Sequence, residues 1–236
     1  MASLAQQDED QLGGPWSVLV RQKRDHVRLD ALLERLPRAP GPEQDQVLHE
    51  IYRLVFPHAF AEESVLWPVV RRVLPDGEAL TRQVEQEHQE VNDLVTSLDG
   101  GRLGAEERAA VLERLVQVLR EDVRDEEDAL LPALQQRLDV RRLRRLGVAW
   151  ELVRRTAPTR PHPVVSRRPP GNALAALPLT VLDRSRDLVD LGARRAPALG
   201  RARLEAASRG LGRAAGVVER RRVFRRGESP VTRVTP

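Results

Sequence analysis

The stretch HAFAEESVLWP, residues 58–68, decides how this chain folds. Its spacing is helical, yet His58 and Glu62 stand where a helix that faces a protein core normally carries leucine or valine. Residues four apart on a helix project in nearly the same direction, so both side chains point toward one place. The stretch DVRDEEDALLP, residues 122–132, repeats the pattern sixty-four positions later with Asp122 and Glu126. This duplication predicts two related helices that carry polar groups into one core.

The composition limits the class of protein. A length of 236 residues suits one ordinary domain with a substantial extension. The chain has no cysteine, so a metal would be held by histidine nitrogen and carboxylate oxygen, which points to iron, manganese or zinc. The N-terminal residues are polar and acidic, and no apolar run reaches the ~18–20 residues of a membrane span. We therefore expect a soluble, cytoplasmic protein, and the arginine-rich composition, with Lys23 the only lysine, is typical of a GC-rich bacterial genome.

Charge divides the chain into unequal parts. Residues 1–150 carry 20 basic and 28 acidic residues, whereas residues 151–236 carry 19 arginines and 7 acidic residues, so their net charges are −8 and +12. The change coincides with a proline cluster, TAPTRPHPVVSRRPPGN, where apolar periodicity stops. We expect a domain, a Pro/Arg-rich linker and a basic helical extension with a partly disordered tail, at residues 15–156, 157–171 and 172–236.

The first part predicts an all-α domain. Apolar residues recur at helical spacing, while glycine and proline gather at the joints. Four long helices joined by short turns make an up-down-up-down four-helix bundle the economical fold. The expected helices cover about residues 16–36, 43–74, 76–98 and 105–138, with a helix at 140–155 as a cover.

Each of the four helices places polar side chains in its apolar seam at mid-length. His26 interrupts the seam of the first helix and His88 that of the third. The sixty-four-residue shift also aligns Glu62 with Glu126, so the two helix pairs should be related by an approximate two-fold axis. Such an arrangement brings six side chains together in the core: His26, His58, Glu62, His88, Asp122 and Glu126.

A metal centre explains why these groups would be buried. Without partners, each would cost several kcal/mol, against a total domain stability of ~5–15 kcal/mol. A single histidine in such a seam is usually a core residue with one hydrogen bond, but six polar positions in phase favour a metal site. The two glutamates would bridge two ions, and the histidines with Asp122 would be terminal ligands, a mixed set that suits iron. Glu63 and Glu127 turn about 100° from this face, either behind the ligands or on the surface, and His162 in the linker has no expected role.

Four segments resemble the hemerythrin-like HHE cation-binding domain family over about residues 16–138: RDHVRLDALL, HAFAEESVLWP, VEQEHQEVNDL and EDVRDEEDALLP. The resemblance implies a four-helix bundle that holds a non-haem di-iron centre. Carried over by position, it implies ligands at His26, His58, Glu62, His88 and Glu126. The family also has a histidine on the fourth helix, and this chain has Asp122 there.

Other folds and functions remain as alternatives. Glu85 and His88 form an ExxH element, which ferritin-like di-iron proteins use twice, but the fourth helix has no second copy. The family resemblance implies binding of, or reaction with, dioxygen, peroxide or nitric oxide, or iron handling. Aspartate in place of imidazole favours Fe(III), which makes reversible oxygen carriage the less favoured of these. The alternative is a regulatory or scaffold protein with a degenerate metal site, whose basic extension contacts nucleic acid, an anionic membrane or its own acidic domain.

Overall fold

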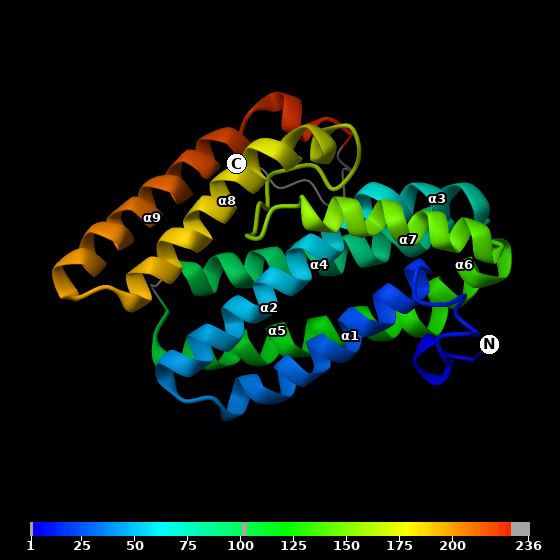
Figure 1. The fold of residues 1–236 in the computed structure, drawn as a ribbon, viewed down its shortest axis with the longest axis horizontal. Coiled ribbons are helices and arrows are strands. Elements are labelled where there is room, and N and C mark those ends of the chain that lie inside the picture. Colours follow the sequence, from blue (N-terminus) through cyan, green and yellow to red (C-terminus); the bar gives the residue numbers. More distant parts are fainter. Residues whose placement is uncertain (1, 101–102, 228–236) are drawn as a thin grey trace.

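The structure, a computed structural model, describes residues 2–100 and 103–227 (Figure 1). These residues are mostly helical and contain no β-strand, which confirms the predicted all-α class. Within the same ranges, every helix is too short or too polar to cross a lipid bilayer. The predicted disorder at the end of the tail falls on residues 228–236, which lie outside the described residues.

Four long helical segments enclose the main interior, and we refer to them as the bundle (residues 18–137). Helix α1 packs against α2, and α4 packs against α5. Two of the segments change helix type partway, where α2 continues into α3 and α5 into α6 through short π-helical turns. The segments are α1 (Val18–Arg35), α2 (Gly41–Ala61) with α3 (Trp67–Val73), α4 (Gly77–Asp99), and α5 (Ala105–Asp125) with α6 (Leu131–Arg137).

Local sequence signals set where these helices begin. The Ser17 hydroxyl accepts a hydrogen bond from the Leu19 N–H at the start of α1. Glycine and proline at positions 41 and 42 open α2, because proline loses no hydrogen bond in the first turn of a helix. The Glu107 side chain accepts from the Gly104 N–H and closes the start of α5. The predicted helix limits therefore agree with the observed ones to within a few residues.

The buried polar residues separate two apolar cores. On α1, Val18, Leu19 and Val20 belong to one core, and Leu29, Leu32 and Leu33 belong to the other, with His26 between them. On α4, Val84 belongs to the first core and Val91 to the second, with His88 between them. The polar layer, defined as His26, His58, Glu62, His88, Asp122 and Glu126, thus lies at mid-length of the bundle and is sealed at both ends by hydrocarbon.

Helix α7 (Val140–Arg155) lies across α1, α2 and the π turn that follows α2. Gly147 permits this close approach, since a Cβ there would lie 2.0 Å from the Trp16 carbonyl oxygen. Trp150 of α7 is 1% exposed and meets the His58 ring edge-on, with the ring centroids 5.3 Å apart. The cover helix therefore shields one side of the polar layer from water.

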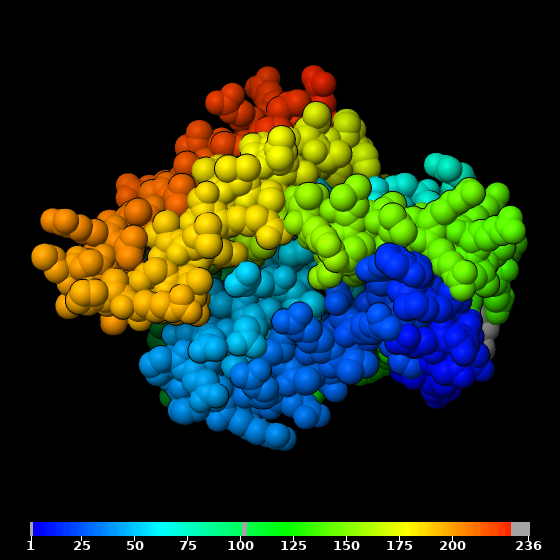
Figure 2. Space-filling model, viewed as in Figure 1, coloured from blue at the N-terminus to red at the C-terminus, as the bar shows by residue number. Residues whose placement is uncertain are grey.

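The extension folds back onto the bundle (Figures 1 and 2). Helices α8 (Gly171–Arg195) and α9 (Ala198–Glu219) form a hairpin with a small core of their own. The Thr180 hydroxyl donates to the Thr156 carbonyl oxygen at 2.6 Å, and Arg160 lies within 2.8 Å of Asp187. Residues 157–170 run along the bundle as a partly buried strap rather than as an exposed connection.

Candidate metal centre

The two glutamates of the polar layer each begin a π-helical turn. These turns span Glu62–Leu66 and Glu126–Leu130. In the first, the Trp67 N–H donates to the Glu62 carbonyl oxygen, five residues back instead of four. Pro68 and Pro132 lie just beyond the turns, and a proline ring would clash with the carbonyl four residues back in a regular α-helix. The repeated proline therefore widens the helix at both glutamates, and π turns often occur at functional sites.

Three histidines point their Nε2 atoms toward the polar layer because their Nδ1 atoms are bound from behind. His26 Nδ1 lies 2.8 Å from Glu127 Oε1, and His88 Nδ1 lies 2.8 Å from Glu63 Oε1. His58 Nδ1 is 3.3 Å from Asp25 Oδ2. A carboxylate that accepts the Nδ1 proton leaves the Nε2 lone pair free for a metal ion, an arrangement shared by most metal-binding histidines.

The facing carboxylates complete the cluster. Glu62 Oε1 is 3.0 Å from His58 Nε2, and Glu62 Oε2 is 3.6 Å from His88 Nε2. Glu126 Oε2 is 3.3 Å from His26 Nε2. Two sets of side chains could each hold a metal ion, and both sets include Glu126. One set is His26, His58 and Glu126, and the other is Glu62, His88 and Glu126. Within each set the ligand atoms lie within 4.8 Å of one another.

Asp122 lies beside these two groups rather than within either. Its Oδ1 atom is 3.6 Å from His88 Nε2, and the residue is 9% exposed. The structure therefore brings all six predicted residues into one layer, with Asp122 nearest to His88.

The carboxylate oxygens of this layer fit a cation. Both oxygens of Glu62, both of Glu126 and Oδ1 of Asp122 are buried, and the histidine Nε2 atoms that lie 3.0–3.6 Å from several of them do not have hydrogen-bond geometry. Buried carboxylates in such surroundings are costly unless a positive charge satisfies them. A pair of metal ions would supply that charge and use these oxygens as ligands.

The acid–base properties of the layer follow from this crowding. Burial alone would lower the pKa of His26, but the carboxylates of Glu126 and Glu127 outweigh it and raise the pKa to about 9. Burial opposes charge on His88 as well, yet Asp122 and the neighbouring glutamates raise its pKa to about 10. Burial raises the pKa of the Asp122 carboxyl well above its ordinary value. Protons thus neutralise the layer, and a metal ion that binds there must displace them.

A small cavity adjoins the layer on the α1, α2 and α5 side. Its volume is about 20 Å³, and its lining includes His58, His88 and Asp122 together with apolar residues of these helices: Leu29, Leu54, Val55, Ala59, Leu119 and Val123. This volume is close to that of a single water molecule, since a site for one water needs ~10–15 Å³ of this kind of volume. Only a ligand of very few atoms fits there.

The carboxylates behind the histidines could not be assigned from the sequence. The sequence places Glu63 and Glu127 either behind the ligands or on the surface, and the structure shows both of them buried against a histidine. The sequence signal for Asp25 is its place directly before His26. The sequence predicts no role for His162, yet its ring contacts Asp183 and Glu219 at 3.1 and 3.0 Å.

These observations define an all-helical protein with a buried cluster of histidines and carboxylates at mid-length. Residues 18–134 match the family model described as Hemerythrin HHE cation binding domain. The bundle of this chain belongs to that family, which confirms the resemblance seen in the sequence motifs.

One curated relative supplies a second comparison. A DNA nickase of Nostoc sp. (strain PCC 7120) is 28% identical over 117 residues, which cover 49% of this chain and 33% of the relative. The match therefore spans about a third of that relative's length. No solved structure matches this chain.

Proposed function

We propose that the polar layer binds two iron ions and that the bound pair reacts with, or reversibly binds, a small ligand such as dioxygen, peroxide or nitric oxide, or serves in iron handling. The observation that carries the proposal is the set of buried carboxylate oxygens without hydrogen bonds, shared between two ligand groups. The family of the bundle is a cation-binding one. An up-down-up-down arrangement of its four segments is part of this proposal, since it would relate the two halves of the site.

In this proposal each side chain has a defined task. His26, His58 and His88 would bind through Nε2, while Glu62 and Glu126 would each offer two oxygens. Iron, when bound, supplies Lewis-acid and redox chemistry toward the small ligand. The Nδ1 protons stay on the rings and are donated to the carboxylates behind them, which fixes the ring orientations. Manganese or zinc could use the same donor set.

Asp122 sets the preferred oxidation state. Its carboxylate adds a negative charge at a position where the family resemblance implies a neutral imidazole, and negative ligands favour Fe(III) over Fe(II). A reversible oxygen carrier needs a durable ferrous state, so reaction with peroxide or oxygen, or iron handling, is favoured over carriage. The apolar lining of the adjoining cavity would limit access to small, weakly polar ligands.

Metal analysis tests this proposal. Protein expressed with ample iron and purified without oxygen should contain about two iron atoms per chain, and its optical spectrum should change on addition of oxygen or peroxide. Glu62→Ala should remove the metal, whereas Glu113→Ala, which deletes an exposed carboxylate of α5, should not. Parent protein without metal, or an equal loss in both variants, would contradict the proposal.

A second candidate function is contact with nucleic acid through the extension, in a regulatory or scaffold role. The curated relative is named a DNA nickase, and helix α9 presents exposed arginines to solvent: Arg201, Arg203, Arg209 and Arg213. Arginine contacts to phosphates release counterions, so binding should weaken steeply as salt rises. The few aromatic residues of the extension do not favour stacking on single strands.

A plasmid assay separates the two candidates. Supercoiled plasmid would be incubated with parent protein, with Glu62→Ala, and with a variant in which the four exposed arginines of α9 are glutamine. If the parent protein nicks the plasmid and both variants fail to do so, nicking requires the metal centre as well as the arginines of α9. Binding lost only in the arginine variant, without nicking in any sample, would support the scaffold role, and no binding at low salt would exclude contact through α9.

A further inference from the structure

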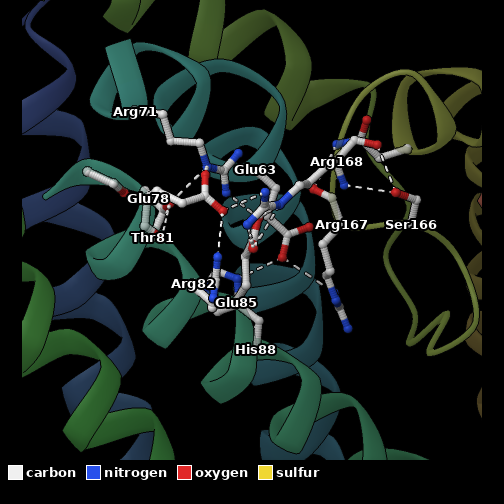
Figure 3. Close-up of polar contacts among 12 residues, drawn as sticks. Glu63, Arg71, Glu78, Thr81, Arg82, Glu85, His88, Ser166, Arg167 and Arg168 are labelled. Atoms are coloured by element: carbon white, nitrogen blue, oxygen red, sulfur yellow. Dashed lines mark hydrogen bonds and ion pairs between the residues drawn. The ribbon is translucent and has the colours of Figure 1, made fainter. Parts of the chain in front are cut away.

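Arg167 of the strap contacts Glu63, the carboxylate behind the proposed metal ligand His88 (Figure 3). The Arg167 guanidinium lies 3.5 Å from Glu63 Oε1, and the same oxygen is 2.8 Å from His88 Nδ1. Arg167 is 8% exposed, and its other terminal nitrogen donates to Gln89 Oε1 at 3.0 Å. The side chain is therefore held between two residues of the bundle, within one contact of the His88 ring.

The neighbouring residue docks the strap without touching a histidine. Arg168 donates to Glu85 Oε2 at 2.7 Å and lies 2.9 Å from Glu78. Glu85 is fully buried and also pairs with Arg71 of α3. Figure 3 shows the two arginines of the strap entering different carboxylate groups. Docking and contact with the metal centre are thus assigned to separate, adjacent side chains.

A similar chain of contacts occurs at His58. Asp25 Oδ2 is 3.3 Å from His58 Nδ1, and Arg154 of α7 lies 3.7 Å from that same oxygen. Both Arg154 and Arg167 lie beyond residue 134, where the match to the family model ends. The third carboxylate behind a histidine, Glu127, instead lines an open groove between α1 and α5. Two of the three histidines are therefore connected to segments that follow the family domain.

We propose that Arg167 is a positioning residue that acts on His88 through Glu63, so that the strap of this chain sets the geometry and reduction potential of the metal centre. The inference rests on the proposed iron site for its effect on potential. Its structural part, the fixing of the His88 ring, holds with or without metal.

The geometry and the charge of Arg167 act on different properties of His88, its orientation and its strength as an electron donor. The guanidinium restricts the Glu63 carboxylate to the orientation that accepts the His88 Nδ1 proton. It also withdraws negative charge from Glu63, which makes the carboxylate a weaker acceptor and the imidazole a weaker electron donor. A weaker donor favours Fe(II) relative to Fe(III), so Arg167 should raise the potential that Asp122 lowers.

The test compares three full-length variants, Arg167→Met, Arg167→Lys and Arg168→Met. Methionine keeps much of the arginine side-chain length without charge, and Arg168→Met is the matched control for loss of docking. Two properties would be measured: the NMR signal of the His88 Nδ1 proton and its exchange with water in metal-free protein, and the reduction potential of the iron-loaded protein. Circular dichroism would verify that each variant is folded.

Arg167→Met should accelerate exchange of the His88 proton and lower the potential, while Arg168→Met should leave both near the parent values. The ratio of Fe(II) to Fe(III) affinity should fall by ~3–10-fold, less than the ~10–100-fold of a direct partner of a ligand. A tenfold change corresponds to about 59 mV for a one-electron couple. Arg167→Lys, which keeps the charge, should recover part of the potential.

The outcomes separate this inference from the proposed function. Unchanged proton exchange in Arg167→Met, or equal changes in Arg167→Met and Arg168→Met, would overturn the positioning role even if the parent binds iron. A parent protein without iron would overturn the metal site, and the exchange measurement alone would then decide whether Arg167 positions His88.

Discussion

Glu63 and Glu127 occupy equivalent positions sixty-four residues apart, and each lies 2.8 Å from the Nδ1 atom of a histidine on another helix. Each directly follows a glutamate of the polar layer within a π turn. In a regular α-helix, successive side chains diverge by about 100°, yet here both members of each pair are buried. One local change of helix type thus lets two adjacent carboxylates serve the same site, the first from the front and the second from behind.

Glu127→Gln should weaken metal binding. The amide oxygen can still accept the Nδ1 proton of His26, but the charge that polarises the imidazole is lost. We expect a ~10-fold loss of affinity, at the lower end for partners of metal ligands. Competition with a chelator measures it, and Asp128→Asn, the exposed neighbour, provides the control. Equal affinities in both variants would show that the Glu127 charge does not act through His26.

Asp122→His tests the departure from the family pattern. If Asp122 binds metal beside His88, the substitution keeps a ligand, removes a negative charge and makes the reduction potential more positive. The variant should also stay ferrous longer after exposure to oxygen, which stopped-flow spectroscopy would record. Unchanged potential and spectrum, while Glu62→Ala empties the site, would mean that the other five residues form the centre alone.

The attachment of the extension should depend on pH through His162. Burial alone would lower the pKa of His162, but Asp183 and Glu219 raise it to about 9. Because the folded pKa lies above the ordinary value near 6.5, the stabilisation is complete below pH 6.5 and is lost as pH rises to about 9 and beyond. Its upper limit is about 3 kcal/mol at 1.36 kcal/mol per pKa unit.

Urea unfolding at pH 6 and pH 9.5 measures this effect as a difference between parent and His162→Gln. The difference in the free energy of unfolding should be largest at pH 6 and small at pH 9.5, while the other buried histidines contribute equally to both proteins. A difference that does not change with pH would show that folding does not shift the pKa of His162.

Residues 1–156 should fold without the rest of the chain. Both apolar cores of the bundle are complete by Val153. Loss of the strap removes one partner of each carboxylate, Arg167 from Glu63 and Arg168 from Glu85. We expect the free energy of unfolding to fall by about 2–4 kcal/mol, somewhat less than for an uncompensated buried charge because each carboxylate keeps a partner within the bundle. Circular dichroism and iron content of the truncated chain check this, and an insoluble product would place the extension within the core.

The sequence was sufficient to predict where the helices lie and which face of each helix carries the residues of the polar layer. Long amphipathic helices have a fixed period, so one misplaced group such as His26 or Glu126 identifies which face is inside. The duplicated spacing then relates the two halves without any knowledge of their packing. All six predicted positions lie in one layer of the structure for this reason.

The sequence was not sufficient for contacts between elements far apart along the chain. Which carboxylate accepts from which Nδ1 depends on how the helix pairs are juxtaposed, so Glu63 and Glu127 could not be assigned. Arg167 lies in a proline-rich segment whose composition is typical of an exposed linker, and its buried position results from where α8 and α9 dock. The π turns had a sequence signal in Pro68 and Pro132, because a proline five or six residues after a buried glutamate restricts the regular helix between them.

The separation of the interior into two apolar cores has a consequence for how the protein unfolds. Cooperative unfolding requires that loosening one region weakens the next, and a polar layer that interrupts the apolar contacts between the two cores transmits such coupling poorly. A metal pair that binds side chains from all four segments would connect the cores into one unit. We therefore expect a single sharp thermal transition in the loaded protein and a broad one, with the two ends melting separately, after chelation.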